Sequence, residues 1–242
     1  MSLLVLMYHR ARAGPRGNAP AALESHFAHV ARHHPCVLPG QPLAAGRLNV
    51  CLTFDDAYFD FHQVVFPLLE KYSLRALLAV APALCGETAE TAPEIRLAQP
   101  DLGLQTPEGT AGLCTWLELR ELAASGRVEL AAHGLNHVRL DDPSADLARE
   151  VVEPKRVLAA RLGVTADSFV FPYGRFSPRA LALARMHYRH TFRIGQASNR
   201  DWSQPLLYRV SADNLADAAA PFATGRLQAY RIKAWWNRLR QK

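Results

Sequence analysis

The sequence predicts an α/β fold with one main domain, and two observations support this prediction. Short apolar segments that end in polar residues alternate along the chain with segments of helical periodicity. The composition, 49% hydrophobic and 21% charged over 242 residues, suits a globular protein that buries one sizeable core. We therefore expect one α/β domain over residues 1–215 and a basic helix with a tryptophan stripe over residues 216–242.

The predicted strands are short apolar runs closed by polar residues. They span residues 3–9, 48–55, 76–81, 127–133, 168–173 and 190–195. Two helix starts are marked by their chemistry. Thr115 with Glu118 fits a capping box, and Ser177 followed by Pro178 fits an N-cap with proline in the first turn.

Two segments depart from this regular alternation. Residues 83–114 are rich in proline, glycine, threonine and alanine without a clear period, so we expect a long irregular connection on the substrate side. Pro154 interrupts a helical pattern over residues 144–162, which predicts a kink or break near Glu150.

Several classes of protein are disfavoured by the sequence. No run of about 18 apolar residues occurs, and the opening segment turns polar before the core of a signal peptide is complete. The four cysteines lack paired metal or redox spacing: Cys36, Cys51, Cys85 and Cys114. We therefore expect a protein of the reducing cytoplasm. The net charge of +6 is dispersed until the C-terminal tail, so nucleic acid is not expected as a partner. No glycine-rich loop follows a strand, so dinucleotide and P-loop nucleotide sites are not supported.

The first candidate active-site residues are Asp55 and Asp56, two adjacent carboxylates at the end of an apolar strand. This arrangement is costly unless a cation or hydrogen bonds offset the repulsion. The alternative is that one of them caps a helix that starts near Phe59.

A second motif follows another strand, where His133 and His137 are spaced so that both imidazoles can approach one cation. Two histidines and one carboxylate leave coordination positions open, as catalytic metal sites require. The tetrahedral preference of zinc makes it our first choice of metal. A chance histidine pair on the surface is the alternative.

Two further strand ends carry polar or unusual residues. In Phe171-Pro172-Tyr173-Gly174, the proline and glycine can hold a backbone that aims a main-chain N–H into a site. His9 ends the first strand, and its simplest alternative is a half-buried histidine with a structural partner. Because α/β barrels place their chemistry at the carboxyl ends of strands, the coincidence of all these motifs there predicts one active site.

The segments TFDDAYFD, HGLNH and FPYG, in this order and separation, resemble the polysaccharide deacetylases of carbohydrate esterase family four, the NodB-like group. The resemblance covers roughly residues 1–212. It implies a distorted (β/α) barrel with fewer than eight strands, about seven.

The resemblance also implies roles for the matching residues. Asp55 corresponds to the general base, and Asp56, His133 and His137 correspond to the metal ligands. Tyr173 corresponds to the residue whose backbone N–H stabilises the oxyanion.

Other positions depart from the usual pattern of the family. The late leucine-histidine that supplies the general acid in many members has no match, but members that begin with a Tyr-His strand imply His9 as the acid. Ala57 stands where the family usually has glycine. Val170 stands where many members have an arginine that orients the base, and we predict that Arg209 substitutes for it.

The implied function is metal-dependent removal of N-acetyl groups from the amino sugars of a glycan or of a lipid-linked glycan intermediate. Zinc is the expected cofactor, with cobalt, nickel or manganese as alternatives. We expect Tyr58, Pro172 and Gly174 to bind substrate. The competing hypotheses are another amide hydrolase, such as a deformylase or amidohydrolase, and a catalytically inactive glycan-binding module.

The C-terminal tail has an apolar helical face made of Ile232, Trp235, Trp236 and Leu239. Basic residues flank this face: Arg226, Arg231, Lys233, Arg238, Arg240 and Lys242. The favoured interpretation is a terminal helix that docks on the barrel through its tryptophans. The alternative is peripheral contact with the inner face of a membrane, where a cytoplasmic enzyme would meet lipid-linked substrates.

Overall fold

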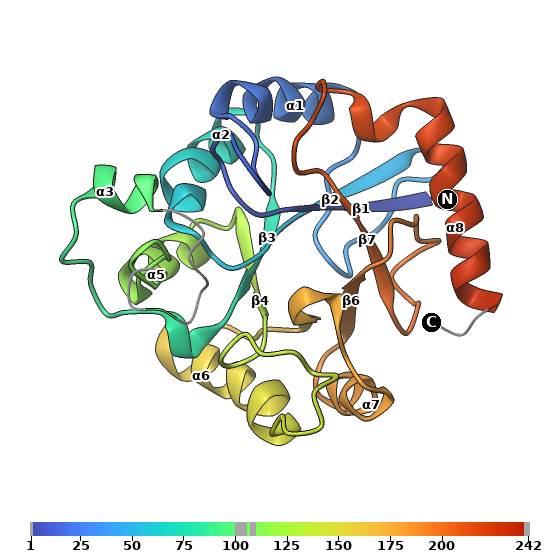
Figure 1. Cartoon of the computed structure of the whole chain (residues 1–242). Helices are drawn as coiled ribbons and strands as arrows, with labels where there is room; N and C mark the ends of the chain where they lie inside the picture. Colours follow the sequence, from blue (N-terminus) through green and yellow to red (C-terminus); the bar gives the residue numbers. More distant parts are fainter. Residues whose placement is uncertain (1, 100–105, 107–109, 240–242) are drawn as a thin grey trace.

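The computed structural model describes residues 2–99, 106 and 110–239. Seven parallel strands form a closed barrel in sequence order (Figure 1). The strands are β1 (Ser2–Tyr8), β2 (Leu48–Phe54), β3 (Ala76–Val80), β4 (Val128–Ala132), β5 (Ser168–Val170), β6 (His190–Ile194) and β7 (Leu207–Ser211). Strand β7 pairs with β1 and closes the barrel. The predicted barrel of about seven strands is confirmed.

Strand β7 was not among the predicted strands, because Arg209 lies in the middle of its short apolar run. The predicted strand over residues 168–173 is also too long. Strand β5 ends at Val170, and a 3₁₀ turn, η4 (Pro172–Gly174), follows it. Pro172 cannot donate a backbone hydrogen bond to a neighbouring strand, so the pairing stops before it.

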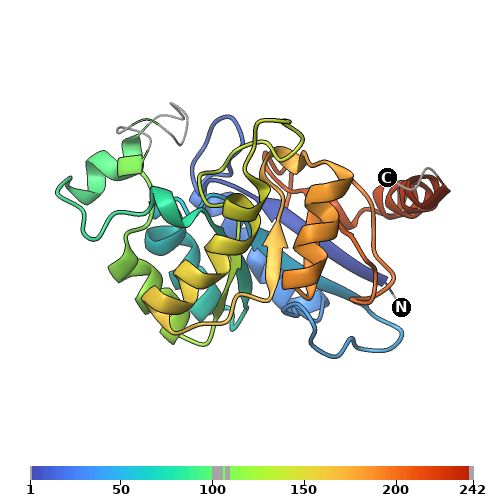
Figure 2. The same cartoon turned by 90° about the horizontal axis from the view of Figure 1, so that it is seen from below.

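Helices surround the barrel (Figures 1 and 2). The α-helices are α1 (Pro20–His33), α2 (Phe66–Lys71), α3 (Pro93–Ala98), α5 (Trp116–Ala124), α6 (Glu153–Leu162), α7 (Pro178–His187) and α8 (Thr224–Leu239). Shorter helical segments are η1 (Phe61–Val65), η2 (Pro82–Leu84), η3 (Ala148–Val152) and η5 (Ala220–Phe222). Thr115 and Glu118 form the predicted capping box at the start of α5, and Ser177 caps α7.

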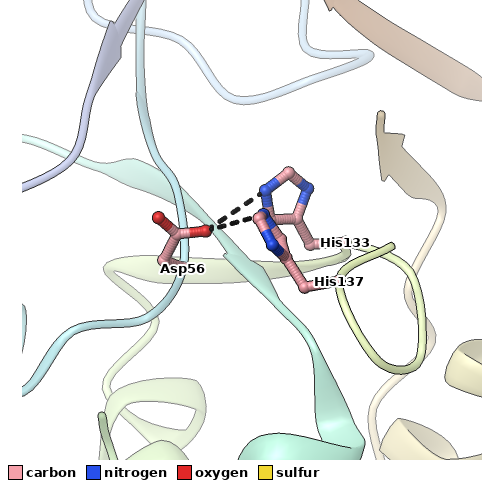
Figure 3. Close-up of side chains that lie close together, drawn as sticks. All are labelled: Asp56, His133 and His137. Carbon is pink, nitrogen blue, oxygen red and sulfur yellow. Dashed lines mark ion pairs between the residues drawn. The ribbon is translucent and has the colours of Figure 1, made fainter. Parts of the chain in front are cut away.

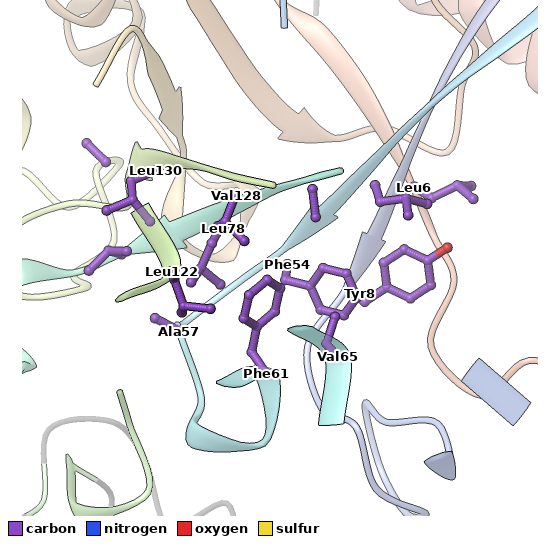
Figure 4. Packing of buried hydrophobic residues seen from close by; sticks show 14 of the residues in the cluster. Leu6, Tyr8, Phe54, Ala57, Phe61, Val65, Leu78, Leu122, Val128 and Leu130 are labelled. Carbon is purple, nitrogen blue, oxygen red and sulfur yellow. The ribbon is translucent and has the colours of Figure 1, made fainter. Parts of the chain in front are cut away.

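Side chains of each strand alternate between two apolar clusters, because successive strand residues point to opposite faces. Leu6, Tyr8 and Phe54 belong to the outer cluster, which packs under the helices (Figure 4). The inner cluster takes buried residues from all seven strands and fills the barrel: Leu3, Val5, Cys51, Leu77, Ala79, Ala131, Val170, Phe192 and Leu207. Val37, from the connection between α1 and β2, joins this cluster. The barrel interior is therefore a packed core.

The connection over residues 83–114 is less irregular than predicted, because it contains helix α3. Arg96 of α3 is buried, lies 3.5 Å above the ring of Phe59 and donates hydrogen bonds to both carboxylate oxygens of Glu118. These contacts tie the segment to the barrel and to α5. Residues 100–105 and 107–109 of this connection lie outside the described part of the chain.

The helix around Pro154 changes geometry where the sequence predicts an interruption. Segment η3 is a π-helix that ends at Val152, and α6 starts at Glu153 with Pro154 in its first turn. Since proline lacks the N–H that would bond to the carbonyl four residues earlier, the wider turn there relieves the clash.

The interpretation that helix α8 docks through its tryptophans is wrong. Tyr230 and Ala234 are buried, whereas Trp235 and Trp236 are 56% and 47% exposed. Arg240 and Lys242 lie outside the described residues, and so do the side chains of Arg238 and Leu239. Among the described helices, none has the length and hydropathy needed to cross a membrane.

Candidate active site

The carboxyl end of the barrel carries ionisable side chains on the same strand faces that fill the interior elsewhere. His9 follows Val5 and Met7 at two-residue steps, and Asp55 follows Cys51 in the same way. His133 stands two residues after Ala131. Because strand side chains alternate with a period of two, these groups extend the inward faces of their strands beyond the apolar core.

Asp56, His133 and His137 form the candidate metal centre (Figure 3). Asp56 Oδ1 lies 3.1 Å from His137 Nε2 and 3.5 Å from His133 Nε2. All three residues are buried, and their candidate ligand atoms lie within 4.8 Å of one another. One carboxylate oxygen and two imidazole nitrogens on one side of an ion are a donor set of catalytic zinc sites.

The surroundings of this group fit a bound cation. His133 Nδ1 lies 2.8 Å from the carbonyl oxygen of Val170, which directs Nε2 toward Asp56. Such an outer hydrogen bond fixes the tautomer of a metal-binding histidine. Among the described residues, Asp56 Oδ1 and His137 Nδ1 have no hydrogen-bond partner. A cation between them would satisfy a buried carboxylate oxygen that faces two imidazole nitrogens.

Glu150 holds the loop between the two histidines. Its Oε2 accepts hydrogen bonds from the backbone N–H groups of Leu135 and Asn136, and its Oε1 accepts one from the Asn136 side chain. A Cβ at Gly134 would meet Glu150 Oε2 at 3.2 Å, so glycine is needed for this approach. The π-helical segment η3, which carries Glu150, therefore helps to position His133 and His137.

Four non-glycine residues around the candidate metal centre have left-handed backbone geometry. The φ angles are 71° at Asp56, 53° at Ala57, 55° at His137 and 57° at Tyr173. Such residues cost roughly 1–3 kcal/mol each and cluster at functional sites. The conformation at Ala57 explains why glycine suits this position, and alanine adopts it here at an energetic cost.

Asp55 is buried and bound by Arg209 through two hydrogen bonds. Arg209 Nη1 donates to Asp55 Oδ1 at 2.5 Å, and Nη2 donates to Oδ2 at 2.8 Å. Burial alone would raise the pKa of Asp55, but the charge and hydrogen bonds of Arg209, together with the nearby His133 and His9, hold this pKa below its usual value. Val170, where an arginine was expected from the resemblance, lies instead in the apolar interior.

His9 lies beside Asp55 and is oriented by Asp213. Its backbone N–H donates to Asp213 Oδ1 at 3.0 Å, its Nδ1 lies 2.8 Å from Asp213 Oδ2, and its Nε2 lies 3.9 Å from Asp55 Oδ2. Burial acts to lower the pKa of His9, but the hydrogen bond to Asp213 and the charge of Asp55 raise it above its usual value. The two contacts with Asp213 hold the His9 ring so that its Nε2 faces Asp55.

The predicted substrate residues differ in exposure. The ring of Tyr173 is 53% exposed, and its centroid lies 4.6 Å from that of His137. Pro172 and Gly174 are buried, and Gly174 packs so closely on Ile194 that a Cβ would meet it at 3.2 Å. Tyr58 is 4% exposed beneath the Arg10 guanidinium, which leaves it little surface for substrate.

The sequence prediction did not identify Asp213 and Glu150, which the structure places against the site. Asp213 follows Arg209 and Ser211 of β7 at two-residue steps, so the signal was available once β7 had been identified as a strand. Glu150 had no comparable signal, because its role depends on the fold of a loop over residues 134–136.

Fold and site together define a (β/α) barrel with a candidate metal centre at its carboxyl end. The chain belongs to the polysaccharide deacetylase family, which matches residues 45–190. His9, Arg209 and Asp213 lie outside the matched segment. A comparison with curated protein sequences finds no match.

Solved structures show the same fold. A de-N-acetylase from Aggregatibacter actinomycetemcomitans superposes with a TM-score of 0.72 and 20% identity, covering 95% of this chain and 100% of that one. The Streptococcus pyogenes deacetylase PplD, in complex with acetate, superposes with a TM-score of 0.73 and 21% identity, covering 93% of this chain and 98% of that one. IcaB from Ammonifex degensii superposes with a TM-score of 0.70 and 21% identity, covering 94% of this chain and 97% of that one.

Proposed function

We propose that this protein is a metal-dependent N-deacetylase that acts on the amino sugars of a glycan or of a lipid-linked glycan intermediate. The observation that carries the proposal is the pair Asp55 and His9, 3.9 Å apart next to the candidate metal centre. A base and an acid on one side of a Lewis-acid site are what hydrolysis of an amide requires.

Asp56, His133 and His137 would hold the cation, with zinc as the first choice. When bound, a divalent cation of this kind supplies Lewis-acid activation of water and polarisation of the acetyl carbonyl.

Asp55 acts as the general base. Its low pKa keeps it ionised, and the Arg209 guanidinium holds both carboxylate oxygens in a fixed plane, so the carboxylate is oriented before substrate arrives. It accepts a proton from the attacking water.

His9 acts as the general acid toward the departing sugar amine. Because Nδ1 is held by Asp213, Nε2 is the nitrogen available to donate the proton, and the raised pKa of His9 favours the protonated form that an acid needs. The backbone N–H of Tyr173, set by its left-handed conformation, stabilises the oxyanion. Acetate and a free amine are the products.

The experiment that tests the proposal combines metal analysis with acetate release. Purified protein should contain about one zinc or related cation and release acetate from N-acetylglucosamine oligomers, since the three buried donors form one site. The variant His133→Ala/His137→Ala should lose both the cation and the activity.

A matched control is available in His29 and His33, a histidine pair four residues apart on α1 whose ring centroids lie 4.6 Å apart. The variant His29→Ala/His33→Ala should keep metal and turnover. Absence of metal after reconstitution would favour the inactive glycan-binding module. Bound metal with hydrolysis of formylated peptides in place of acetylated sugars would favour the other amide hydrolases.

A further inference from the structure

We propose that helix α8 binds the surface of a bilayer that contains anionic lipids, through the exposed face formed by Ile232, Trp235 and Trp236. Figures 1 and 2 show α8 at the outer edge of the molecule, on the side of the barrel where β1 begins. The inference concerns a second surface and does not depend on the proposed deacetylase activity.

The exposed face of α8 is large and apolar. Ile232, Trp235 and Trp236 are 59%, 56% and 47% exposed, and they follow one another at three- and four-residue spacing, which places them on one side of an α-helix. The rings of the two tryptophans are in contact, with their centroids 5.0 Å apart. Three large apolar side chains on one exposed helix face indicate a surface used for binding.

The opposite face of α8 already holds the helix on the barrel. Ala234 packs with Ala197 and Tyr208, and the carbonyl oxygen of Tyr230 accepts a hydrogen bond from the backbone N–H of Ser198. Leu227 packs against the outer core cluster. Because docking uses this face, the tryptophan face stays exposed while the helix is held in place.

Charge identifies the kind of surface. Residues 218–242 contain no aspartate or glutamate. Arg231 and Lys233 are exposed and lie on either side of Ile232 along the helix circumference, and Arg226 is exposed in the first turns. Tryptophan favours the depth of lipid headgroups, and flanking cations complement anionic headgroups at that depth.

A second copy of the chain is less suited to this face. A symmetric contact would bring the same residues together, so the basic flanks formed by Arg231 and Lys233 would face those of the partner. Like charges across a contact oppose association, whereas an anionic bilayer attracts both flanks.

The test is co-sedimentation of the full-length protein with vesicles of phosphatidylcholine alone and of phosphatidylcholine mixed with phosphatidylglycerol. The wild type should bind the mixed vesicles, and added salt should weaken this binding. The variant Trp235→Ala/Trp236→Ala should bind about tenfold more weakly, because it loses most of the apolar area that enters the interface. The variant Arg231→Gln/Lys233→Gln should lose the preference for anionic lipid.

Met186, which is 78% exposed on α7, provides the matched control. Met186→Ala should bind as the wild type does, and all variants should unfold thermally at the same temperature because the changed side chains are exposed. Equal vesicle binding by the wild type and the double tryptophan variant would overturn the proposal. It would also be overturned by a dimer in analytical ultracentrifugation that the tryptophan changes dissociate, or by a single-stranded oligonucleotide that binds this face while vesicles do not.

Discussion

The two halves of the barrel interior come from the same strands but differ in chemistry. Toward the amino ends, the inward positions include the fully buried apolar residues Val5, Cys51 and Leu77. A few inward positions nearest the strand starts are polar, as at Asn49 and His190. Toward the carboxyl ends, the same faces carry His9 and Asp55. The step from an apolar to an ionisable side chain takes four residues, from Val5 to His9 and from Cys51 to Asp55. Residues deeper in the barrel therefore stabilise the fold, and residues at the carboxyl ends are suited to catalysis.

The energetic consequences of the two halves differ in the same way. Burying an aliphatic side chain contributes roughly 1.5–3 kcal/mol. Burying Asp55 and Arg209 requires that both lose their hydration, and their attraction does little more than offset this loss. Four left-handed residues add strain around the candidate metal centre. The charged half is therefore expected to be selected for its chemistry, and substitutions in the two halves should have separable effects.

The largest expected effect is on turnover by Asp55→Asn. An amide cannot accept the proton, so kcat should fall about 10³-fold, whereas metal content should stay that of the wild type because Asp56 and the histidines are unchanged. Asp60 provides a matched control, since it is also buried and accepts a hydrogen bond from Arg10 Nε at 2.7 Å. Asp60→Asn should lower stability but change turnover far less. Equal losses of turnover in the two variants would contradict the role of Asp55.

The next largest effect is on stability and separates the two halves directly. Leu77→Ala should lower the free energy of unfolding of the metal-free protein by about 3 kcal/mol, because Leu77 is fully buried in the inner cluster. His137→Ala should lower it by less, about 1 kcal/mol, since the lost contact of Nε2 with Asp56 is partly offset by removal of Nδ1, a buried nitrogen without a hydrogen-bond partner. Urea denaturation after chelation measures both. The reverse order would mean that the charged half also stabilises the fold.

A smaller effect is expected at the proposed acid. His9→Gln should lower kcat about 100-fold with little change in KM, because the leaving amine loses its proton donor while the binding surface is kept. His62, whose Nε2 lies 2.9 Å from Glu121, offers the same change at another histidine with an acidic partner. Steady-state kinetics of His62→Gln should match the wild type. If His9→Gln also matches the wild type, the proton donor lies elsewhere.

Much of the charged half could be predicted from the sequence because its residues directly follow apolar strands. Asp55, Asp56 and His133 each come within one or two residues of a strand end, and parallel strands bring their carboxyl ends to one side. The contact between Asp55 and Arg209 was harder to derive. It joins residues 154 positions apart and depends on closure of the barrel through β7. The arginine in the middle of β7 interrupts its apolar pattern, so the sequence did not predict this strand.

The orientation of α8 could not be predicted from periodicity. The helix has two apolar faces, one with Tyr230 and Ala234 and one with the tryptophans, and only the space available beside Ala197 and Tyr208 decides which one docks. Small side chains allow the closer approach, so the less hydrophobic face is buried. Hydrophobicity alone therefore favoured the wrong face.

Asp213 leads to the prediction with the smallest effect, a shift in pH dependence without loss of the catalytic groups. Turnover by this mechanism needs Asp55 ionised and His9 protonated. Burial acts to lower the pKa of His9, but the hydrogen bond to Asp213 and the charge of Asp55 raise it, so activity should persist above the usual histidine range and fall as pH rises through the raised pKa. In Asp213→Asn the pKa of His9 should fall, and the alkaline limb of the kcat profile should move to lower pH.

The acidic limb distinguishes this effect from general damage to the site. It depends on Asp55, whose pKa is raised by burial but held below its usual value by Arg209, His133 and His9 together, so it should stay in place in Asp213→Asn. Asp217→Asn, at an exposed aspartate in the same segment of the chain, should leave both limbs unchanged. A profile of Asp213→Asn that drops in height with both limbs fixed would mean that Asp213 only supports the local fold and does not set the protonation of His9.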